Sequence, residues 1–294
     1  MSRLNLVDSY NRTVQQKIGG VLSARLRDPL NSLWWQITED LLAPFEKKLE
    51  HCSSVKILDY GGGCGHKSAN IAVSLMKLCK KVHVDYFDLD PIACVLAKTM
   101  FDNLGIPNRV VELYDDFMMA EKESYDFVVF SEVYEHFPLD QVSVLTKDIS
   151  EKIKRGGFLL LTTPNFYGMG RAEDADEYYK RRKLGHYKHY TPEEVTRNLS
   201  VFGLKDVACR YSCDKRSKIK LFSKFWYPFF RLDGRLTNSK KIPAILRKLY
   251  FLGSHPFFAL LDKFLHPFMC SMFRQGYTNP DPKSSRTLHL LFQK

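Results

Sequence analysis

The stretch "VKILDYGGGCGH" (55–66) limits the fold more than any other part of the chain. It starts as a short apolar run of the kind that forms a buried strand. Gly61, Gly63 and Gly65 follow at once, and "SANIAVSLMKLCKK" (68–81) then has the spacing of an amphipathic helix. A glycine turn between a strand and a helix lets a ligand approach the backbone at the carboxyl edge of a sheet. The stretch therefore predicts a ligand-binding strand–turn–helix unit.

The glycine spacing limits which ligand this turn can bind. A dinucleotide fingerprint that began at Gly61 would need glycine at position 66, where the chain has His66. The phosphate-loop pattern GxxxxGK[ST] is also absent from the sequence. A nucleoside ligand without a pyrophosphate does not need the third glycine. The turn therefore favours such a ligand.

Apolar strands alternate with helical segments after this turn. The further predicted strands are 81–89, 109–114, 125–133 and 157–165, and the helices between them include 91–105 and 138–157. Near-continuous apolar strands that are separated by helices are typical of a parallel sheet with helices on both faces. The sequence therefore predicts an α/β fold with a doubly wound, mostly parallel sheet.

A later helix carries its own start signal. Thr191 is the predicted N-cap, Pro192 the first helical residue and Glu194 the third. This pattern is a capping box, in which the threonine and glutamate side chains bind backbone N–H groups reciprocally. We expect a helix to begin there.

The fourth predicted strand ends in a group of charged residues, in "VVFSEVYEHFP" (128–138). Glu132, Glu135 and His136 are spaced i, i+3 and i+4, so one helical turn would place them on one face. Charged groups at the end of a buried strand usually have a partner or a chemical task. The three residues are either a catalytic or metal-binding cluster or a polar brace for the loop.

Cysteine usage and the chain's hydropathy predict a cytoplasmic protein. The seven cysteines are odd in number and form no CxxC pair, which favours a reducing compartment. The first residues lack the apolar core of a signal peptide. No run of about 18 apolar residues predicts a simple transmembrane helix.

The sequence resembles the class I S-adenosylmethionine-dependent methyltransferases over about residues 50–210. Five motifs carry the resemblance in the family's order: "ILDYGGGCG", "FDLDP", "ELYDDF", "YDFVVFSEVYEH" and "IKRGGFLLLTTPN". The resemblance implies a Rossmann-like sheet of seven strands and S-adenosylmethionine as the cofactor. It also implies a methyltransferase activity.

The resemblance also assigns residues to the cofactor. Asp59 and the three loop glycines would hold its amino-acid end. Asp88 would accept hydrogen bonds from the ribose hydroxyls, a role for which Asp85 and Asp90 compete but which the spacing to Pro91 favours for Asp88. The remaining cofactor-binding residues that the resemblance implies are Asp115 or Asp116 at the adenine amino group, with Asp115 preferred, and Ser131.

The pattern EVxEH resembles two subfamilies, the O-methyltransferases of ubiquinone biosynthesis and the 2′-O-methyltransferases of small-RNA 3′ ends. Both imply a divalent cation, Mg²⁺ or another, bound by Glu132, Glu135, His136 and a later histidine. "GHYKHYTPEE" supplies His186, which we prefer to His189. Such a cation would lower the pKa of the acceptor hydroxyl. Without a metal, Glu135 or His136 could act as the general base.

The C-terminal part departs from the family pattern. Residues 204–213 and 286–294 fit the family's last two strands, and a helical insertion of about 70 residues separates them. The predicted parts are as follows: an N-terminal helical cap (1–50), a cofactor-binding core (51–213), a basic aromatic insertion (214–285) and the last strand (286–294).

The insertion carries the positive charge of the chain. Residues 214–294 hold 16 Lys and Arg and 4 Asp and Glu, a net charge of +12, whereas the rest of the chain has a net charge of −1. Aromatic residues interleaved with basic ones suit contact with an anionic membrane surface, where the protein would bind peripherally. RNA binding and a small helical subdomain with an aromatic core are the alternatives.

These observations predict O-methylation of an apolar small molecule or a lipid-linked acceptor. The first alternative is an RNA 2′-O-methyltransferase, because of the charge and the EVxEH pattern. The second is a cofactor-binding partner subunit without turnover.

Overall fold

The computed structural model describes twelve stretches of the chain. They are residues 29–49, 52–79, 81–111, 122–169, 186–212, 242–243, 245–246, 249–250, 260, 264, 282–283 and 285–294. Most of the predicted insertion and the first 28 residues lie outside the described residues.

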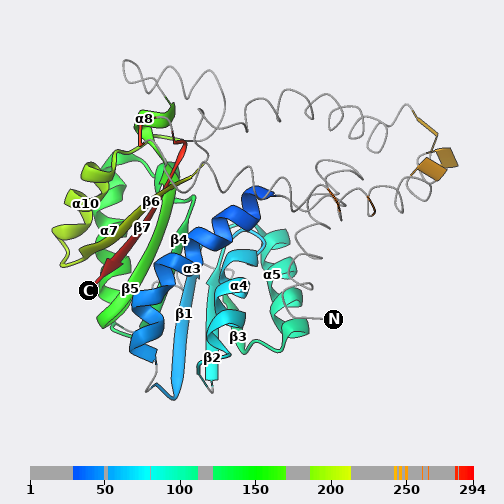
Figure 1. The fold of residues 1–294 in the computed structure, drawn as a ribbon, viewed down its shortest axis with the longest axis horizontal. Coiled ribbons are helices and arrows are strands. Elements are labelled where there is room, and N and C mark those ends of the chain that lie inside the picture. Colours follow the sequence, from blue (N-terminus) through cyan, green and yellow to red (C-terminus); the bar gives the residue numbers. More distant parts are fainter. Residues whose placement is uncertain are drawn as a thin grey trace. The chain divides into compact units, whose positions relative to one another are not determined.

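The described residues form a sheet flanked by helices (Figure 1). The strands are β1 (Ser54–Tyr60), β2 (Lys81–Phe87), β3 (Asn108–Val111), β4 (Tyr125–Ser131), β5 (Ile153–Pro164), β6 (Lys205–Ser212) and β7 (Thr287–Gln293). The helices are α3 (Pro29–Leu49), α4 (His66–Leu75), α5 (Pro91–Leu104), α7 (Leu139–Lys152), α8 (Phe166–Met169) and α10 (Pro192–Ser200), with a short 3₁₀ turn η1 (Tyr134–His136).

The sheet has seven strands in the order β3-β2-β1-β4-β5-β7-β6. β1 pairs in parallel with β2 and β4, β2 with β3, and β4 with β5, whereas β7 is antiparallel to both β5 and β6. The predicted seven-stranded, mostly parallel sheet is therefore confirmed. Its strand order reverses between β1 and β4, which is where open α/β sheets form their ligand crevice.

Helices cover the two faces of the sheet (Figure 1). α3, α4 and α5 lie on one face, where Phe45 of α3 packs 4.8 Å from Phe127 of β4 between ring centroids. α7 and α10 lie on the other face and pack into a cluster of buried residues that includes Val128, Leu145 and Leu199. Strand residues point alternately to the two faces, so a strand buried on both sides needs a continuous apolar run.

Each strand predicted for the core is present in the structure, but one boundary was wrong: α7 ends at Lys152 and β5 begins at Ile153, whereas the helix was predicted to extend to residue 157. The strand predicted at 109–114 is described only as Asn108–Val111, and its remaining residues lie outside the described part. The capping box is confirmed, because Thr191 accepts a hydrogen bond from the Glu194 amide while the Glu194 side chain accepts one from the Thr191 amide. The helices predicted at 1–50 are described from Pro29 onward.

The chain divides into two compact units. One unit holds residues 37–212 and 281–294, and it contains the whole sheet. The other holds residues 1–36 and 213–280. The roles predicted for the N-terminal cap and for the 214–285 insertion stay predictions.

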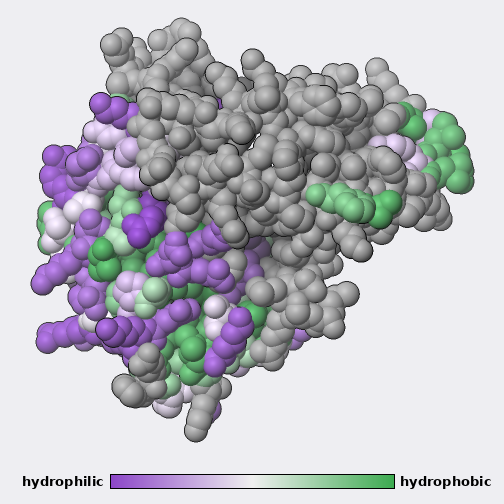
Figure 2. Space-filling model, in the orientation of Figure 1, coloured by the Kyte–Doolittle hydropathy of each residue, from purple (hydrophilic) through white to green (hydrophobic). Residues whose placement is uncertain are grey.

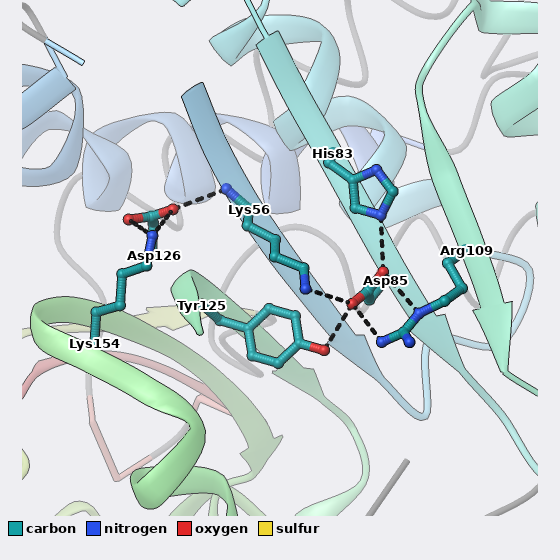
Figure 3. Close-up of polar contacts among 7 residues, drawn as sticks. All are labelled: Lys56, His83, Asp85, Arg109, Tyr125, Asp126 and Lys154. Atoms are coloured by element: carbon teal, nitrogen blue, oxygen red, sulfur yellow. Dashed lines mark hydrogen bonds and ion pairs between the residues drawn. The ribbon is translucent and has the colours of Figure 1, made fainter. Parts of the chain in front are cut away.

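A buried carboxylate ties three strands and the start of β4 together (Figure 3). Asp85 of β2 accepts hydrogen bonds from His83 Nε2, Arg109 Nη2 and Tyr125 Oη, each at 2.8 Å, and Lys56 Nζ lies 3.2 Å away. Burial alone would raise the pKa of Asp85, but these donors together hold it well below its usual range. Asp85 is thus committed to the sheet and does not lie at a strand end, so it is not available to a ribose.

Replacing Asp85 with asparagine should destabilise the fold by about 2–4 kcal/mol at pH 7, because the basic groups around it lose their buried counter-charge. The contribution of a carboxylate with a lowered folded pKa is present above its unfolded pKa of about 3.9 and is lost as the pH falls below that value. The difference between wild type and Asp85→Asn should therefore shrink in acid. Urea unfolding at pH 7 and pH 3 measures it, with Asp140→Asn, at an exposed position of α7, as a control that should unfold like wild type. Equal stabilities of Asp85→Asn and wild type at pH 7 would contradict this role.

Candidate active site

The candidate site lies at the carboxyl ends of β1, β2 and β4, where the strand order reverses. The glycine turn after β1 and the turn after β4 are in close contact there. A Cβ atom added to Gly61 would lie 2.7 Å from Cγ2 of Val133, so only glycine allows this approach. The two predicted functional motifs are therefore adjacent in space.

The turn after β1 has the backbone that the glycine pattern predicts. Gly61, Gly63 and Gly65 have φ angles of 68°, 59° and 71°, in the left-handed region that favours glycine. Gly62 has a different constraint, because a Cβ atom there would lie 2.2 Å from Oδ2 of Asp59. The turn thus packs directly over the Asp59 carboxylate.

Asp59 is buried beneath the turn, with 1% of its surface exposed. Ser68 Oγ donates a hydrogen bond to its Oδ2 atom at 2.5 Å, whereas its buried Oδ1 atom has no hydrogen-bond partner among the described residues. Burial raises the pKa of Asp59 to about 7, although the Ser68 hydroxyl and the nearby Lys67 act in the opposite direction. A buried acceptor without a partner is costly, so this atom fits a cationic ligand group.

Asp88 follows β2 and faces the same turn. Its Oδ2 atom accepts a hydrogen bond from the Gly63 amide at 2.8 Å, and its Oδ1 atom accepts one from the Asp90 amide at 2.9 Å. Each carboxylate oxygen can accept two hydrogen bonds, so Asp88 can hold the turn and also accept from a ribose. Asp90 instead lies at the start of α5, where its carbonyl accepts from the Cys94 amide. Asp115 and Asp116 lie outside the described residues.

The turn after β4 begins with a strained residue. Glu132 has a φ of 57°, which is unusual for a residue with a side chain. Its amide donates to the Thr162 carbonyl at 2.8 Å, and its Oε1 atom is buried with no hydrogen-bond partner in the described part of the chain. Ser131, directly before it, shares a 2.5 Å hydrogen bond with Thr162 Oγ1. Strain and an unsatisfied acceptor mark this turn as more than a connection.

Glu135 is the buried carboxylate of the second motif, with 1% of its surface exposed. Thr163 Oγ1 donates a hydrogen bond to Glu135 Oε2 at 3.0 Å. The backbone carbonyl of Glu135 accepts one from the Tyr187 amide at 2.7 Å. Burial, reinforced by the nearby Glu132 charge, raises the pKa of Glu135 to about 8. Glu135 therefore carries a proton at neutral pH unless a cation is beside it.

Two histidines complete a cluster with Glu135. The rings of His136 and His186 meet edge to face, with centroids 4.5 Å apart, and His136 Nε2 lies 4.0 Å from Glu135 Oε1. Ligand atoms of Glu135, His136 and His186 all lie within 4.8 Å of one another, a spacing that could hold a metal ion. One carboxylate and two imidazoles suit a transition metal better than Mg²⁺.

Behind this cluster, His189 orients His186. Its Nε2 atom lies 3.0 Å from His186 Nδ1, so these two nitrogens share one proton. Burial lowers the pKa of His186, and the charge of His136 adds to this effect. Burial also lowers the pKa of His189 to about 4, and His186 adds to that shift. Both rings are thus neutral at pH 7. This second role for His189 differs from the ligand role considered for it in the sequence.

Glu132 does not join the three-residue group. The sequence spacing assumed one helical turn from Glu132 to His136, but η1 begins only at Tyr134 and the left-handed backbone at Glu132 precedes it. Its charge instead acts on Lys67 of α4. Lys67 was missed in the sequence, although a lysine directly after a glycine turn, at the start of an amphipathic helix, is the signal that could have revealed it.

A family model described as "Methyltransferase domain" matches residues 23–208. The chain belongs to the class I S-adenosylmethionine-dependent methyltransferase family. The observed sheet order and glycine turn agree with this assignment, and the cofactor of the family is S-adenosylmethionine. The match does not separate the two EVxEH subfamilies, which stay predictions.

Solved structures support the fold of this methyltransferase. A protein from Galdieria sulphuraria described as a sarcosine dimethylglycine methyltransferase matches with a TM-score of 0.53 and 14% identity, over 88% of this chain and 86% of that one. A cyclopropane synthase from Mycobacterium tuberculosis matches with a TM-score of 0.50 and 16% identity, over 87% and 84% of the two chains. A search of curated protein sequences gave no match.

Proposed function

We propose that this methyltransferase methylates a hydroxyl group on an apolar small molecule or a lipid-linked acceptor. The observation that carries the proposal is the convergence of Glu135, His136 and His186 beside the glycine turn. An acceptor hydroxyl must lose its proton when it takes a methyl group, so a base or a cation is needed beside the donor. These residues supply both possibilities at that place.

Each motif has a separate task in this proposal. S-adenosylmethionine supplies the activated methyl group. Asp59 and the glycine turn bind its amino-acid end, Asp88 accepts from its ribose, and Ser131 lines the same edge. His136, whose side chain is 44% exposed, meets the acceptor and takes its proton. Once the imidazolium has formed, its positive charge favours the ionised form of Glu135, which releases its own proton to solvent, and the resulting carboxylate stabilises the imidazolium.

A divalent cation bound by Glu135, His136 and His186 is the second way to activate the hydroxyl. The donor set fits, since the raised pKa of Glu135 and its buried position favour a nearby positive charge. Such a cation would lower the pKa of the acceptor hydroxyl. Glu132 would support the site through its charge rather than as a ligand.

A labelled-methyl transfer screen tests the activity and the metal together. Lipid, quinone and RNA extracts are each incubated with the protein and labelled S-adenosylmethionine, with and without EDTA. We expect label in an apolar, hydroxyl-bearing product. Loss of transfer with EDTA and recovery with added metal would support the cation, and full activity after EDTA would exclude it. Label in RNA that falls steeply with salt would favour the RNA 2′-O-methyltransferase alternative.

The alternative of a partner subunit without turnover makes a different prediction. Such a protein would bind S-adenosylmethionine in calorimetry but transfer no label to any extract. The protein would then contribute its cofactor site to another chain.

The 214–285 insertion supports the choice of an apolar or lipid-linked acceptor and a peripheral membrane location. Its described residues include large exposed apolar side chains, and Figure 2 shows such hydrophobic surface in green. They are Ile245, Leu246, Leu249, Leu260 and Phe264. Basic residues surround them in the sequence, which suits an anionic lipid surface. Among the helices described, none is long and apolar enough to span a bilayer.

Vesicle flotation should show binding to anionic vesicles at low salt, at least about fivefold above binding to neutral vesicles, because each basic residue near the surface adds about 1 kcal/mol. Phe264→Ser, at a site that is 70% exposed, should weaken this binding. The matched control is Val201→Ser, at a 74% exposed site in the unit that contains the sheet, and it should bind like wild type. Equal recovery with both vesicle types would argue against membrane contact.

A further inference from the structure

Lys67 occupies an unusual place at the candidate site. It is the second residue of α4, directly after the glycine turn, and its Nζ atom donates a hydrogen bond to Ser131 Oγ at the end of β4. Its side chain therefore crosses from the β1 turn to the end of β4. These are the two strand ends that border the ligand crevice of the sheet.

Acidic groups surround this ammonium. The charges of Glu132, Asp59 and Glu135 all favour its protonated form, whereas burial lowers the pKa of Lys67. Lys67 in turn stabilises the ionised forms of Asp59 and Glu135. Lys67 thus lies among the carboxyl groups of Glu132, Asp59 and Glu135, and Asp88 faces the same glycine turn.

Two physical costs oppose a lysine at this position. The first turn of a helix carries partial positive charge, which disfavours a second cation. Burial of the ammonium adds a desolvation cost. A hydrophobic residue at the second position of α4 would avoid both costs. The charges of Glu132, Asp59 and Glu135 offset them in part, and an anionic ligand group at the crevice would offset them further.

The charged groups of the crevice are complementary to those of the methyl donor. S-adenosylmethionine carries two positive groups, its sulfonium and its ammonium, and one negative group, its carboxylate. Asp59 presents an acceptor that no described residue satisfies, which suits the ammonium. Lys67 is the group of opposite charge on the same turn–helix unit, one residue from the Ser68 that contacts Asp59.

We infer that Lys67 binds the carboxylate of the methyl donor and so determines which end of the donor's amino acid lies toward β4. This inference rests on the cofactor assignment within the proposed function, and it does not depend on the acceptor or the metal. Its alternative is that Lys67 serves only as an internal counter-ion for Asp59 and the two glutamates.

Binding measurements with two ligands separate these roles. Calorimetry of wild type should show S-adenosylmethionine binding about 10- to 100-fold more tightly than its decarboxylated analogue, which lacks the carboxylate, because a charge-assisted hydrogen bond is lost. Lys67→Met should bind both ligands with nearly equal affinity. Lys67→Arg, which keeps the charge, should retain a preference for the carboxylated ligand, and Lys77→Met beyond the end of α4 should behave as wild type.

Three results would overturn the inference. One is a wild type that binds the two ligands equally. Another is a Lys67→Met variant that weakens both ligands but keeps the wild-type ratio, as expected of a counter-ion alone. The third result applies if circular dichroism shows that Lys67→Met does not fold. It is a Lys67→Arg variant that binds the two ligands with equal affinity. A wild type that binds both ligands with the expected ratio but transfers no methyl group would refute the proposed activity and leave the role of Lys67 intact.

Discussion

Replacing Glu135 with glutamine should lower kcat by about 10²- to 10⁴-fold, the range expected when acid–base assistance is lost. Glutamine keeps the side-chain volume and can still accept a hydrogen bond from Thr163, which lies 3.0 Å from the carboxylate. It cannot supply the negative charge that stabilises a protonated His136 or a bound cation. The rate of labelled-methyl transfer to the acceptor found in the screen measures the effect.

The split between binding and turnover distinguishes this role from a structural one. The affinity of Glu135→Gln for S-adenosylmethionine should stay within about threefold of wild type, because the donor is bound by the β1 turn. Glu39→Gln, at an exposed position of α3, controls for the loss of an acidic group elsewhere. Activity of Glu135→Gln close to that of wild type would remove Glu135 from the chemistry.

The core of the fold could be predicted because its signals are local. An apolar run followed by glycines defines β1 and its turn, and the left-handed φ angles of Gly61, Gly63 and Gly65 are what those glycines permit. The Thr191 capping box likewise depends on residues only three positions apart. Chain connectivity then leaves few arrangements for strands separated by helices.

The detailed site could be predicted only in part, because its contacts join distant segments. The expectation that Glu132 shares a helical face with Glu135 assumed regular backbone, and the positive φ of Glu132 breaks that assumption. The pairing of His186 with His136 was anticipated from the family resemblance, but the support from His189 was not. Spacing along the sequence does not reveal which partner satisfies a buried polar atom.

Lys67 and Asp85 also show that the role of a charged residue could not be predicted from its position in the sequence. Lys67 contributes a charge to the site, yet it belongs to none of the motifs that carry the family resemblance. Asp85 belongs to a strand that leads to the site, yet its four neighbours commit it to the stability of the sheet (Figure 3). An acidic residue near a motif acquires its role from the side chains that surround it.

Affinity for S-adenosylmethionine should rise with pH up to about 7 and then level off, because Asp59 must be ionised to bind the ammonium of the donor. Its pKa is raised to about 7 by burial, so the protonated, weakly binding form predominates below that pH. A single required ionisation gives up to tenfold tighter binding per pH unit on the acidic side. Calorimetry between pH 5.5 and 7.5 measures this profile.

Two variants identify the titrating group. Asp59→Asn should bind the donor about 10- to 100-fold more weakly at pH 7.5 and should lose the pH dependence, since no carboxylate remains to ionise. Ser68→Ala removes the hydroxyl that donates to Asp59 Oδ2, a hydrogen bond that favours the ionised form. The midpoint of its profile should therefore move to higher pH. A wild-type affinity that is constant over this range would mean that the donor ammonium does not depend on the charge of Asp59.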